Sequence, residues 1–303
     1  MRKSKNISRD EWLAKAGILT EALPYMRRYA GKTFVIKYGG HAMGDADLAQ
    51  HFARDIVLLK QVGIHPVVVH GGGPQIGVML DRLKMKSKFI DGLRVTDRNT
   101  VGIVEMVLSG QINKKIVADI TEAGGHAIGL SGKDGGLMRA RKLQRRAKRT
   151  DSNIEKVLNL GFVGEPAAID PHVLRLLESS QFIPVIAPIG ADTKGQTFNI
   201  NADTVAGAIA SALDATRLLM LTDVEGAQNK KRQLIAEMNL DSARKYLRDG
   251  TFKGGMIPKI ETCISAIKGG VEAAAILDGR VPHAILLEIF TEHGSGTLIR
   301  GKK

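Results

Sequence analysis

Glycine-rich turns that follow apolar, strand-like runs are the first sign of chemistry in this sequence. They are Lys37-Tyr38-Gly39-Gly40, His70-Gly71-Gly72-Gly73 and the segment 129–136, and the first of them begins with a lysine. Glycine lets backbone N–H groups come close to an anion, and a following helix adds its positive end. Ligands of open α/β sheets bind at the carboxyl ends of strands. The turns together favour a phosphate site, although each could also be only a tight connection.

Two familiar phosphate-binding motifs fail on inspection. Ala30-Gly31-Lys32-Thr33 resembles the end of a P-loop, but Met26 stands where the upstream glycine is required. The segment 71–77 departs from the dinucleotide fingerprint, because its last glycine comes one residue late. No HExxH, paired-histidine or Ser-His-Asp pattern appears. A P-loop NTPase and a nicotinamide dehydrogenase are therefore both disfavoured.

Strand-like and helix-like segments alternate along the chain and would carry these turns. Apolar runs at 33–37, 66–69, 127–130, 182–187, 218–222 and 273–277 predict buried strands, and helical spacing is found at 47–62, 98–123, 171–180, 201–213, 241–249 and 257–268. Short runs between residues 137 and 169 predict hairpins. This order is typical of an α/β fold with a mainly parallel sheet. A helix-like segment at 9–30, interrupted by Gly17 and Pro24, precedes the first strand as an added arm.

Composition limits the class of protein further. The chain has 303 residues, 44% of them hydrophobic and 25% charged, which excludes collagen-like, coiled-coil and wholly disordered chains. Cys263 is the only cysteine, so an intrachain disulfide and a cysteine-based metal site are excluded. The basic N-terminus lacks the apolar core of a signal peptide, and no stretch predicts a membrane span. We expect a cytoplasmic protein.

The chain is strongly basic, with a formal net charge of +13. Such a charge suits nucleic acid as a partner, but it equally suits polyanionic small molecules. The densest basic segment, 139–149, contains no aromatic residue on which a base could stack. We interpret it as a solvated face or flap, and we expect no nucleic-acid partner.

Six motifs in a fixed order resemble the amino-acid kinase family. They are KYGG at 37–40, VVVHGGGP at 67–74, DGLRVTD at 91–97, NINADTVA at 199–206, LLMLTDVEG at 218–226 and GGMIPK at 254–259. The match runs from Thr33 to Ile299 and is most similar to the arginine-sensitive members that phosphorylate N-acetyl-L-glutamate in arginine biosynthesis. The resemblance implies a three-layer αβα sandwich. It also implies an oligomerising arm (1–30), an N-lobe for the acyl-amino acid and for dimerisation (31–190), and a C-lobe for ATP and an inhibitor (191–303).

The reaction implied by this resemblance moves the γ-phosphoryl group of ATP onto a side-chain carboxylate. That nucleophile is already deprotonated at neutral pH, so no general base is required, and positioning and fixed positive charge supply the catalysis. The resemblance makes Lys37, Lys259 and Asp203 catalytic. Lys37 would act from the accepting side and Lys259 on the β- and γ-phosphates, with Asp203 holding both lysines. Mg²⁺ would be carried by the nucleotide, and the sequence offers no protein ligand for it.

The resemblance also assigns residues that bind phosphate and substrate. Arg94 would grip the α-carboxylate of acetylglutamate, which suits a bidentate fork, and Asn199 would fix the acetamido group. The phosphate-binding residues would be Gly40, Gly71 and Gly72, and the substrate-binding residues would be Gly72, Gly73, Arg94 and Asn199. The three catalytic candidates also have structural alternatives. Lys37 could cap the sheet, Lys259 could face solvent, and Asp203 could be an ordinary charge in the first turn of a helix.

Arginine-sensitive members have a helix before the first strand that interlaces dimers into a hexamer, a trimer of dimers. Segment 21–25 matches the end of that helix, and segment 283–297 matches part of the inhibitor pocket. Tyr25 and Glu288 are therefore candidate contacts for L-arginine. The alternative is that the arm only oligomerises. Rival functions are a sister kinase acting on carbamate or on an aminoadipate derivative, a catalytically silent nucleotide or arginine sensor, and a nucleic-acid binder.

Overall fold

A computed structural model describes residues 8–40, 43–90, 92–149, 152–292 and 294–301 of the chain. Residues 1–7 of the predicted arm lie outside these ranges, as does Asp91 of the DGLRVTD motif. Within the described residues, no helix is both long and apolar enough to cross a membrane.

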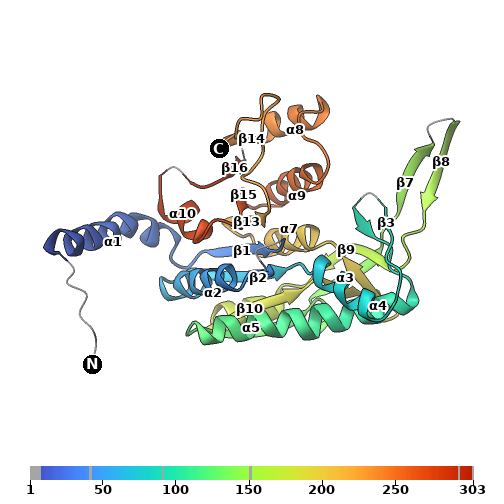
Figure 1. Ribbon diagram of the computed structural model, residues 1–303, viewed down its shortest axis with the longest axis horizontal. Helices are drawn as coiled ribbons and strands as arrows, with labels where there is room; N and C mark the ends of the chain where they lie inside the picture. Colours follow the sequence, from blue (N-terminus) through green and yellow to red (C-terminus); the bar gives the residue numbers. More distant parts are fainter. Residues whose placement is uncertain (1–7, 41–42, 91, 150–151, 293, 302–303) are drawn as a thin grey trace.

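An eight-stranded sheet forms the centre of the molecule (Figure 1). Its strands are β1 (Thr33–Tyr38), β2 (His65–His70), β5 (His126–Ser131), β10 (Phe182–Ala187), β13 (Arg217–Thr222), β14 (Glu237–Asn239), β15 (Ala273–Asp278) and β16 (Thr297–Arg300). The order is β14-β16-β15-β13-β1-β2-β10-β5, and only the β15–β16 pair is antiparallel. The predicted α/β class with a mainly parallel sheet is therefore confirmed.

Helices pack on both faces of this sheet. Those in the described residues are α1 (Arg9–Tyr29), α2 (Ala46–Gln61), α3 (Gly73–Arg82), α4 (Arg98–Glu105), α5 (Asn113–Glu122), α6 (His172–Glu178), α7 (Ala202–Ala212), α8 (Leu240–Arg248), α9 (Met256–Lys268) and α10 (Ala284–Phe290). Helix α1 extends away from the sheet at one end of the molecule (Figure 1).

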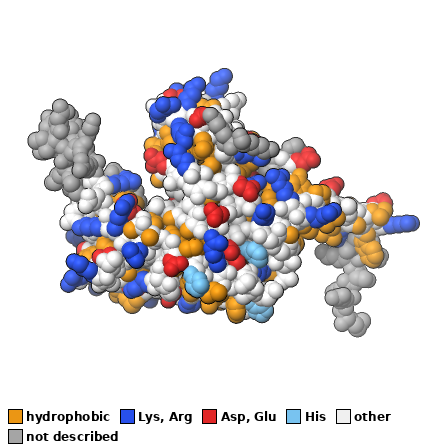
Figure 2. Space-filling view, turned by 180° about the vertical axis from the view of Figure 1, so that it is seen from behind, with side chains coloured by type: hydrophobic (Ala, Val, Ile, Leu, Met, Phe, Trp, Pro, Cys, Tyr) orange, Lys and Arg blue, Asp and Glu red, His pale blue; other side chains and the backbone are white. Residues whose placement is uncertain are grey.

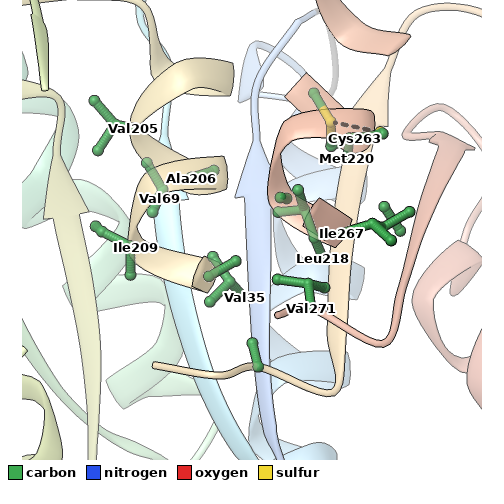
Figure 3. Packing of buried hydrophobic residues seen from close by; sticks show 14 of the residues in the cluster. Val35, Val69, Val205, Ala206, Ile209, Leu218, Met220, Cys263, Ile267 and Val271 are labelled. Carbon is green, nitrogen blue, oxygen red and sulfur yellow. Dashed lines mark hydrogen bonds between the residues drawn. The ribbon is translucent and has the colours of Figure 1, made fainter. Parts of the chain in front are cut away.

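Two hydrophobic cores follow from the alternation of side chains along each strand. On β1, Val35 points to the core that it shares with α7 and α9, whereas Phe34 and Ile36 point to the opposite core with α2, α5 and α10. Figure 3 shows the first core, where Val35 lies among side chains of both helices and Cys263 contacts Met220. Helix, sheet and helix thus form the three expected layers.

Smaller elements surround one end of the sheet. The strands β6 (Met138–Lys142), β9 (Val163–Ile169), β11 (Ile189–Ala191) and β12 (Thr197–Ile200) form a second, closed sheet. Two hairpins, β3 (Phe89–Ile90) with β4 (Leu93–Arg94) and β7 (Arg145–Arg149) with β8 (Ser152–Leu158), stand beside it. The β7–β8 hairpin projects from the body (Figure 1), so the basic segment 139–149 is divided between β6 and this hairpin.

Two predicted helices differ from expectation. Helix α1 continues through Pro24, which is exposed, so water can bind the carbonyl that loses its N–H partner. The predicted helix 98–123 begins at its expected cap, because Asp97 accepts a 2.8 Å hydrogen bond from the N–H of Thr100. It is not uniform, however: the π-helical segment η2 (Met106–Ile112) separates α4 from α5.

Candidate active site

Three charged side chains from distant parts of the chain meet at the carboxyl end of the sheet. The ammonium nitrogen of Lys37 lies 3.1 Å from Oδ1 of Asp203, and that of Lys259 donates to Oδ2 at 2.8 Å. The Lys37 and Asp203 side chains are 10% exposed and that of Lys259 is 16% exposed. Two largely buried cations therefore converge on one carboxylate, which excludes a solvent-facing Lys259.

Local sequence explains why these groups meet. Lys37 is two residues beyond Val35 on β1 and so points to the same face, where α7 and α9 lie. Asn201 caps α7 by accepting from the N–H of Asp203 at 2.8 Å, which places Asp203 in the first turn. Gly207 then lets α7 approach α9 closely, because a β-carbon there would lie 2.7 Å from a methyl of Thr262.

The cluster is electrostatically balanced by its shared carboxylate. Burial lowers the pKa of Lys37, as does the neighbouring Lys259, while Asp203 opposes both effects. Burial alone would raise the pKa of Asp203, but the two lysines outweigh it and hold the pKa below its usual value. Asp203 is therefore an anion across the physiological range, and it keeps two positive charges side by side.

The glycine turns lie beside this cluster. A β-carbon on Gly39 would meet Nζ of Lys37 at 2.6 Å, so a larger residue there would collide with the lysine. Gly40 has a φ of +77° and faces the Asp223 carboxylate. At the second turn, the N–H of Gly71 donates to the carbonyl of Tyr38 at 2.8 Å. That bond ties β2 to β1, and it differs from the expectation that this N–H holds a phosphoryl group.

A pocket of about 180 Å³ opens next to the glycine turn. Its lining includes Gly71, Gly72, Gly73, Arg94, Asn199 and Asn201. Asn201 and Ala202 line the pocket and directly precede Asp203, so the pocket adjoins the helix turn that carries the shared carboxylate. The structure thus brings together all the predicted substrate-binding residues, next to the predicted catalytic ones.

Arg94 is held rigidly at the wall of this pocket. Its guanidinium donates to the carbonyl of Gly73 at 2.8 Å and to the hydroxyl of Ser87, and it stacks 4.6 Å from the centre of the Phe89 ring. Burial lowers the pKa of Arg94, an effect that Asp81 opposes. Asn199 donates to the hydroxyl of Thr96 at 3.3 Å. A buried cation beside a polar amide suits a ligand that carries both a carboxylate and an amide.

Comparison with known proteins agrees with this geometry. Residues 32–278 match the model of the amino acid kinase family. The chain is 66% identical over 296 residues to acetylglutamate kinase of Rhodospirillum centenum, covering 98% of this chain and 97% of the relative. It is also 66% identical over 292 residues to acetylglutamate kinase of Rhodospirillum rubrum, covering 96% and 94%.

The chain belongs to the amino acid kinase family. The resemblance to its acetylglutamate kinases is confirmed over nearly the full length, and the protein is an enzyme of this kinase type. Solved structures share the fold. N-acetylglutamate synthase from Neisseria gonorrhoeae complexed with coenzyme A and N-acetyl-glutamate superposes with a TM-score of 0.81 at 24% identity, over 95% of this chain and 64% of that one. Carbamate kinase from Giardia lamblia bound to citric acid gives 0.62 at 19%, over 90% and 100%.

Some contacts in this family member were not identified from the sequence as part of the site. Ser87 and Phe89 hold Arg94, and Thr96 holds Asn199. Asp223, directly after β13, is a further one, because the structure sets its carboxylate against Gly40. The GLRVT motif could have drawn attention to Thr96, but nothing in residue type or spacing indicates Ser87.

A second cavity, of about 480 Å³, lies between α1 and the C-terminal segment. Tyr25 lines it from α1 and Glu288 from α10, so the two candidate inhibitor contacts share one cavity. Burial raises the pKa of Glu288, an effect opposed by the N–H of Ser295, which donates to the carboxylate at 2.9 Å. Arg217 and Arg300 line the same cavity and also oppose this rise.

The positive φ of Gly40 yields a first prediction. Gly40→Ala should lower the free energy of unfolding by about 1–2 kcal/mol and lower kcat by about 10²-fold. Alanine is strained there, and it displaces the Asp223 carboxylate, whose charge acts on Lys37. Gly31→Ala is the matched control: Gly31 has a φ of +72°, but a β-carbon there meets nothing within 4 Å. Denaturant unfolding and steady-state kinetics compare the Gly40→Ala and Gly31→Ala variants. An equal kcat in both variants would show that Gly40 has no role in the active site.

Proposed function

We propose that the protein transfers the γ-phosphoryl group of ATP to the side-chain carboxylate of N-acetyl-L-glutamate, in the biosynthesis of arginine. A carboxylate oxygen attacks the γ-phosphorus, the bond to the β,γ-bridging oxygen breaks, and an acyl phosphate and ADP result. The observation that carries the proposal is the convergence of Lys37 and Lys259 on Asp203, next to a pocket walled by Arg94. The curated relatives with 66% identity are named for this kinase activity.

The residues divide the work by charge. Lys37 faces the accepting carboxylate and reduces its repulsion with the γ-phosphate, and Lys259 neutralises the charge that develops on the leaving oxygen. Arg94 and Asn199 fix the acetylglutamate, since truncating a substrate contact allows misplacement and loss of rate. We assign the acyl substrate to residues 31–190 with the adjoining Asn199, and ATP to residues 191–303.

The site also bears on how Mg²⁺ is held. Among the described residues, no group of three or more histidine, cysteine, aspartate or glutamate side chains could hold a metal ion. Asp203, the central anion, is already paired with two lysines. This donor set fits a magnesium ion that arrives on the nucleotide phosphates, where it neutralises phosphate charge.

Trapping the product tests the proposal directly. Hydroxylamine converts an acyl phosphate into a hydroxamate, so ATP with acetylglutamate should yield an acyl-hydroxamate at a rate set by enzyme concentration. L-Glutamate, carbamate and N-acetyl-aminoadipate serve as alternative acceptors. Faster turnover of N-acetyl-aminoadipate would favour the sister kinase, and binding of ATP without turnover of any acceptor would favour a sensor.

We further propose that L-arginine inhibits the enzyme from the cavity between α1 and α10. The Glu288 carboxylate supplies an acceptor for a guanidinium, and Arg217 and Arg300 supply positive charge for an α-carboxylate. Tyr25 closes the cavity from the side of the arm. Because the cavity adjoins the first residue of β13, an occupant would contact the strand whose other end leads to Asp223.

Glu288→Gln tests this inhibitor site. Losing the charged hydrogen bond to a guanidinium should raise the arginine concentration for half-inhibition by about 10- to 100-fold, with kcat unchanged in the absence of arginine. The matched control is Glu292→Gln, since Glu292 lines the same cavity but is exposed. Inhibition that responds equally to both substitutions, or to neither, would contradict the role of Glu288.

The arm is proposed to join dimers into a hexamer. Helix α1 leaves Trp12, Leu19 and Leu23 on one stripe, at 66%, 68% and 49% exposure, which is a surface suited to a second copy of the same helix. Deleting residues 1–30 should therefore yield dimers that still turn over and are insensitive to arginine, as measured by light scattering and by the trapping assay. A truncated chain that stays hexameric or remains fully inhibited would refute this role.

A cytoplasmic location remains a prediction.

A further inference from the structure

His70 is a fully buried histidine at the start of the second glycine turn, and both its ring nitrogens have partners. It is 0% exposed, so it cannot touch a substrate. Nδ1 lies 2.7 Å from the carbonyl oxygen of Gly71, and Nε2 lies 3.3 Å from the side-chain amide nitrogen of Asn113. The first contact reaches the backbone of the glycine turn itself.

The contacts of Asn113 fix the orientation of its amide. Its Nδ2 donates to the carbonyl of Val185 at 2.9 Å, and a longer contact of 3.4 Å joins it to the carbonyl of Leu130. Its Oδ1 accepts from Nζ of Lys114 at 3.1 Å. Since carbonyl oxygens only accept hydrogen bonds, the nitrogen must be the atom that faces them, and it is also the atom that faces His70.

These contacts determine the tautomer of His70. A carbonyl oxygen faces Nδ1, so Nδ1 must carry the proton and donate it to Gly71. A donor faces Nε2, so Nε2 must be unprotonated and accept. Burial lowers the pKa of His70 to about 4, although the bond to Gly71 opposes this change. The ring is thus neutral and fixed at both ends in the physiological pH range.

The π-helical segment η2 explains how Asn113 reaches this position. Asn113 follows η2 directly and is 1% exposed, with its side chain between β5 and β10. The same segment presses Leu108 and Ile112 against Gly72, where a β-carbon would lie 2.6 Å from a methyl of Leu108. One side of the glycine turn is therefore packed by η2, and its carbonyl is held through His70. Wide turns of this kind recur at functional sites.

We propose that His70 and Asn113 are positioning residues for phosphoryl transfer: the neutral, Nδ1-protonated imidazole, held by Asn113, fixes the peptide of Gly71 so that Gly72 and Gly73 present their backbone to the reacting groups. This inference rests on the proposed function. It predicts that loss of the Nδ1 donor acts on the chemical step, since a shift of about 1 Å in a positioning group can cost about 10²-fold in rate.

Two substitutions separate positioning from bulk packing. His70→Asn keeps an N–H donor near the place of Nδ1, whereas His70→Leu fills the space without one. We expect His70→Leu to lower kcat by about 10- to 100-fold, with the KM for ATP within threefold of wild type, and His70→Asn to restore kcat to within about fivefold. Equal losses in the two variants, or an unchanged kcat in His70→Leu, would overturn the proposal.

A spectroscopic measurement on the wild-type chain keeps the test decisive if His70→Leu fails to fold. Long-range ¹H–¹⁵N spectra of histidine-labelled protein, with the His70 signal assigned by its loss in His70→Asn, should show the Nδ1-protonated tautomer at pH 7. An Nε2-protonated ring or an imidazolium would overturn the inference. If acetylglutamate is the wrong acceptor, turnover is absent from wild type and variants alike. A wrong positioning role instead leaves wild-type turnover intact and removes the difference between variants.

Discussion

Lys37→Ala should lower kcat by about 10³-fold while the dissociation constant for ATP changes by less than about threefold. The lysine stands on the accepting side of the proposed transfer, so its charge matters most when the phosphoryl group moves; losing a single such donor typically costs about 10²–10³ in kcat. Rapid-quench kinetics and nucleotide titration measure the two quantities separately.

Lys115→Ala is the control for Lys37→Ala. Lys115 lies on α5 with its side chain 69% exposed, and it forms an i,i+4 ion pair with Asp119 on the same helix. Removing it should leave kcat within twofold of wild type, because exposed pairs contribute little. An unchanged kcat in Lys37→Ala would show that Lys37 is not catalytic. The convergence of the two lysines on Asp203 would then have only a structural role.

Asp203→Asn should be damaging to both stability and rate. Breaking a buried ion pair from one side typically costs about 3–5 kcal/mol, because the remaining charge is left unpaired. Here two ammonium groups lose their shared partner. Burial already lowers the pKa of Lys37, and the substitution lowers it further, so kcat should fall by about 10²-fold or more and recover in part as the pH is lowered.

The pH dependence of stability gives a second measure of Asp203. Its pKa is depressed in the folded state, so its contribution is present above the unfolded value of about 3.9 and is lost as pH falls below that value toward the folded one. The difference in unfolding free energy between wild type and Asp203→Asn should thus shrink below pH 4. Asp241→Asn, on an exposed i,i+3 pair of α8, should show little difference at any pH. If the difference in unfolding free energy between wild type and Asp203→Asn persists at low pH, the substitution destabilises the protein through packing and not through loss of charge.

Much of the fold could be predicted because the controlling signals are local. The alternation of β1 places Lys37 on the same face as Val35, and the cap at Asn201 places Asp203 in a first helical turn. Only the motif resemblance predicts their meeting with Lys259, since no local pattern joins three segments so far apart in the chain. The structure agrees with that inference.

The features that escaped prediction depend on long-range contacts. The N–H of Gly71 is used by the carbonyl of Tyr38 on a neighbouring strand, a partner that the glycine motif does not contain. The π-helical segment η2 packs Leu108 and Ile112 against Gly72, and Asn113 after it donates to the carbonyl of Val185. The helical periodicity of 98–123 does not indicate this segment. Helix α1 continues through Pro24, which sequence spacing does not reveal.

The contact of Gly207 with Thr262 has a mechanical consequence. Because no space remains between α7 and α9 at that point, the separation of the Asp203 and Lys259 backbones is dictated by backbone proximity and cannot be adjusted by a change of rotamer alone. We therefore expect α7 and α9 to behave as one rigid unit. Because Lys37 already lies 3.1 Å from Asp203, this fixed spacing extends to the strand that carries Lys37.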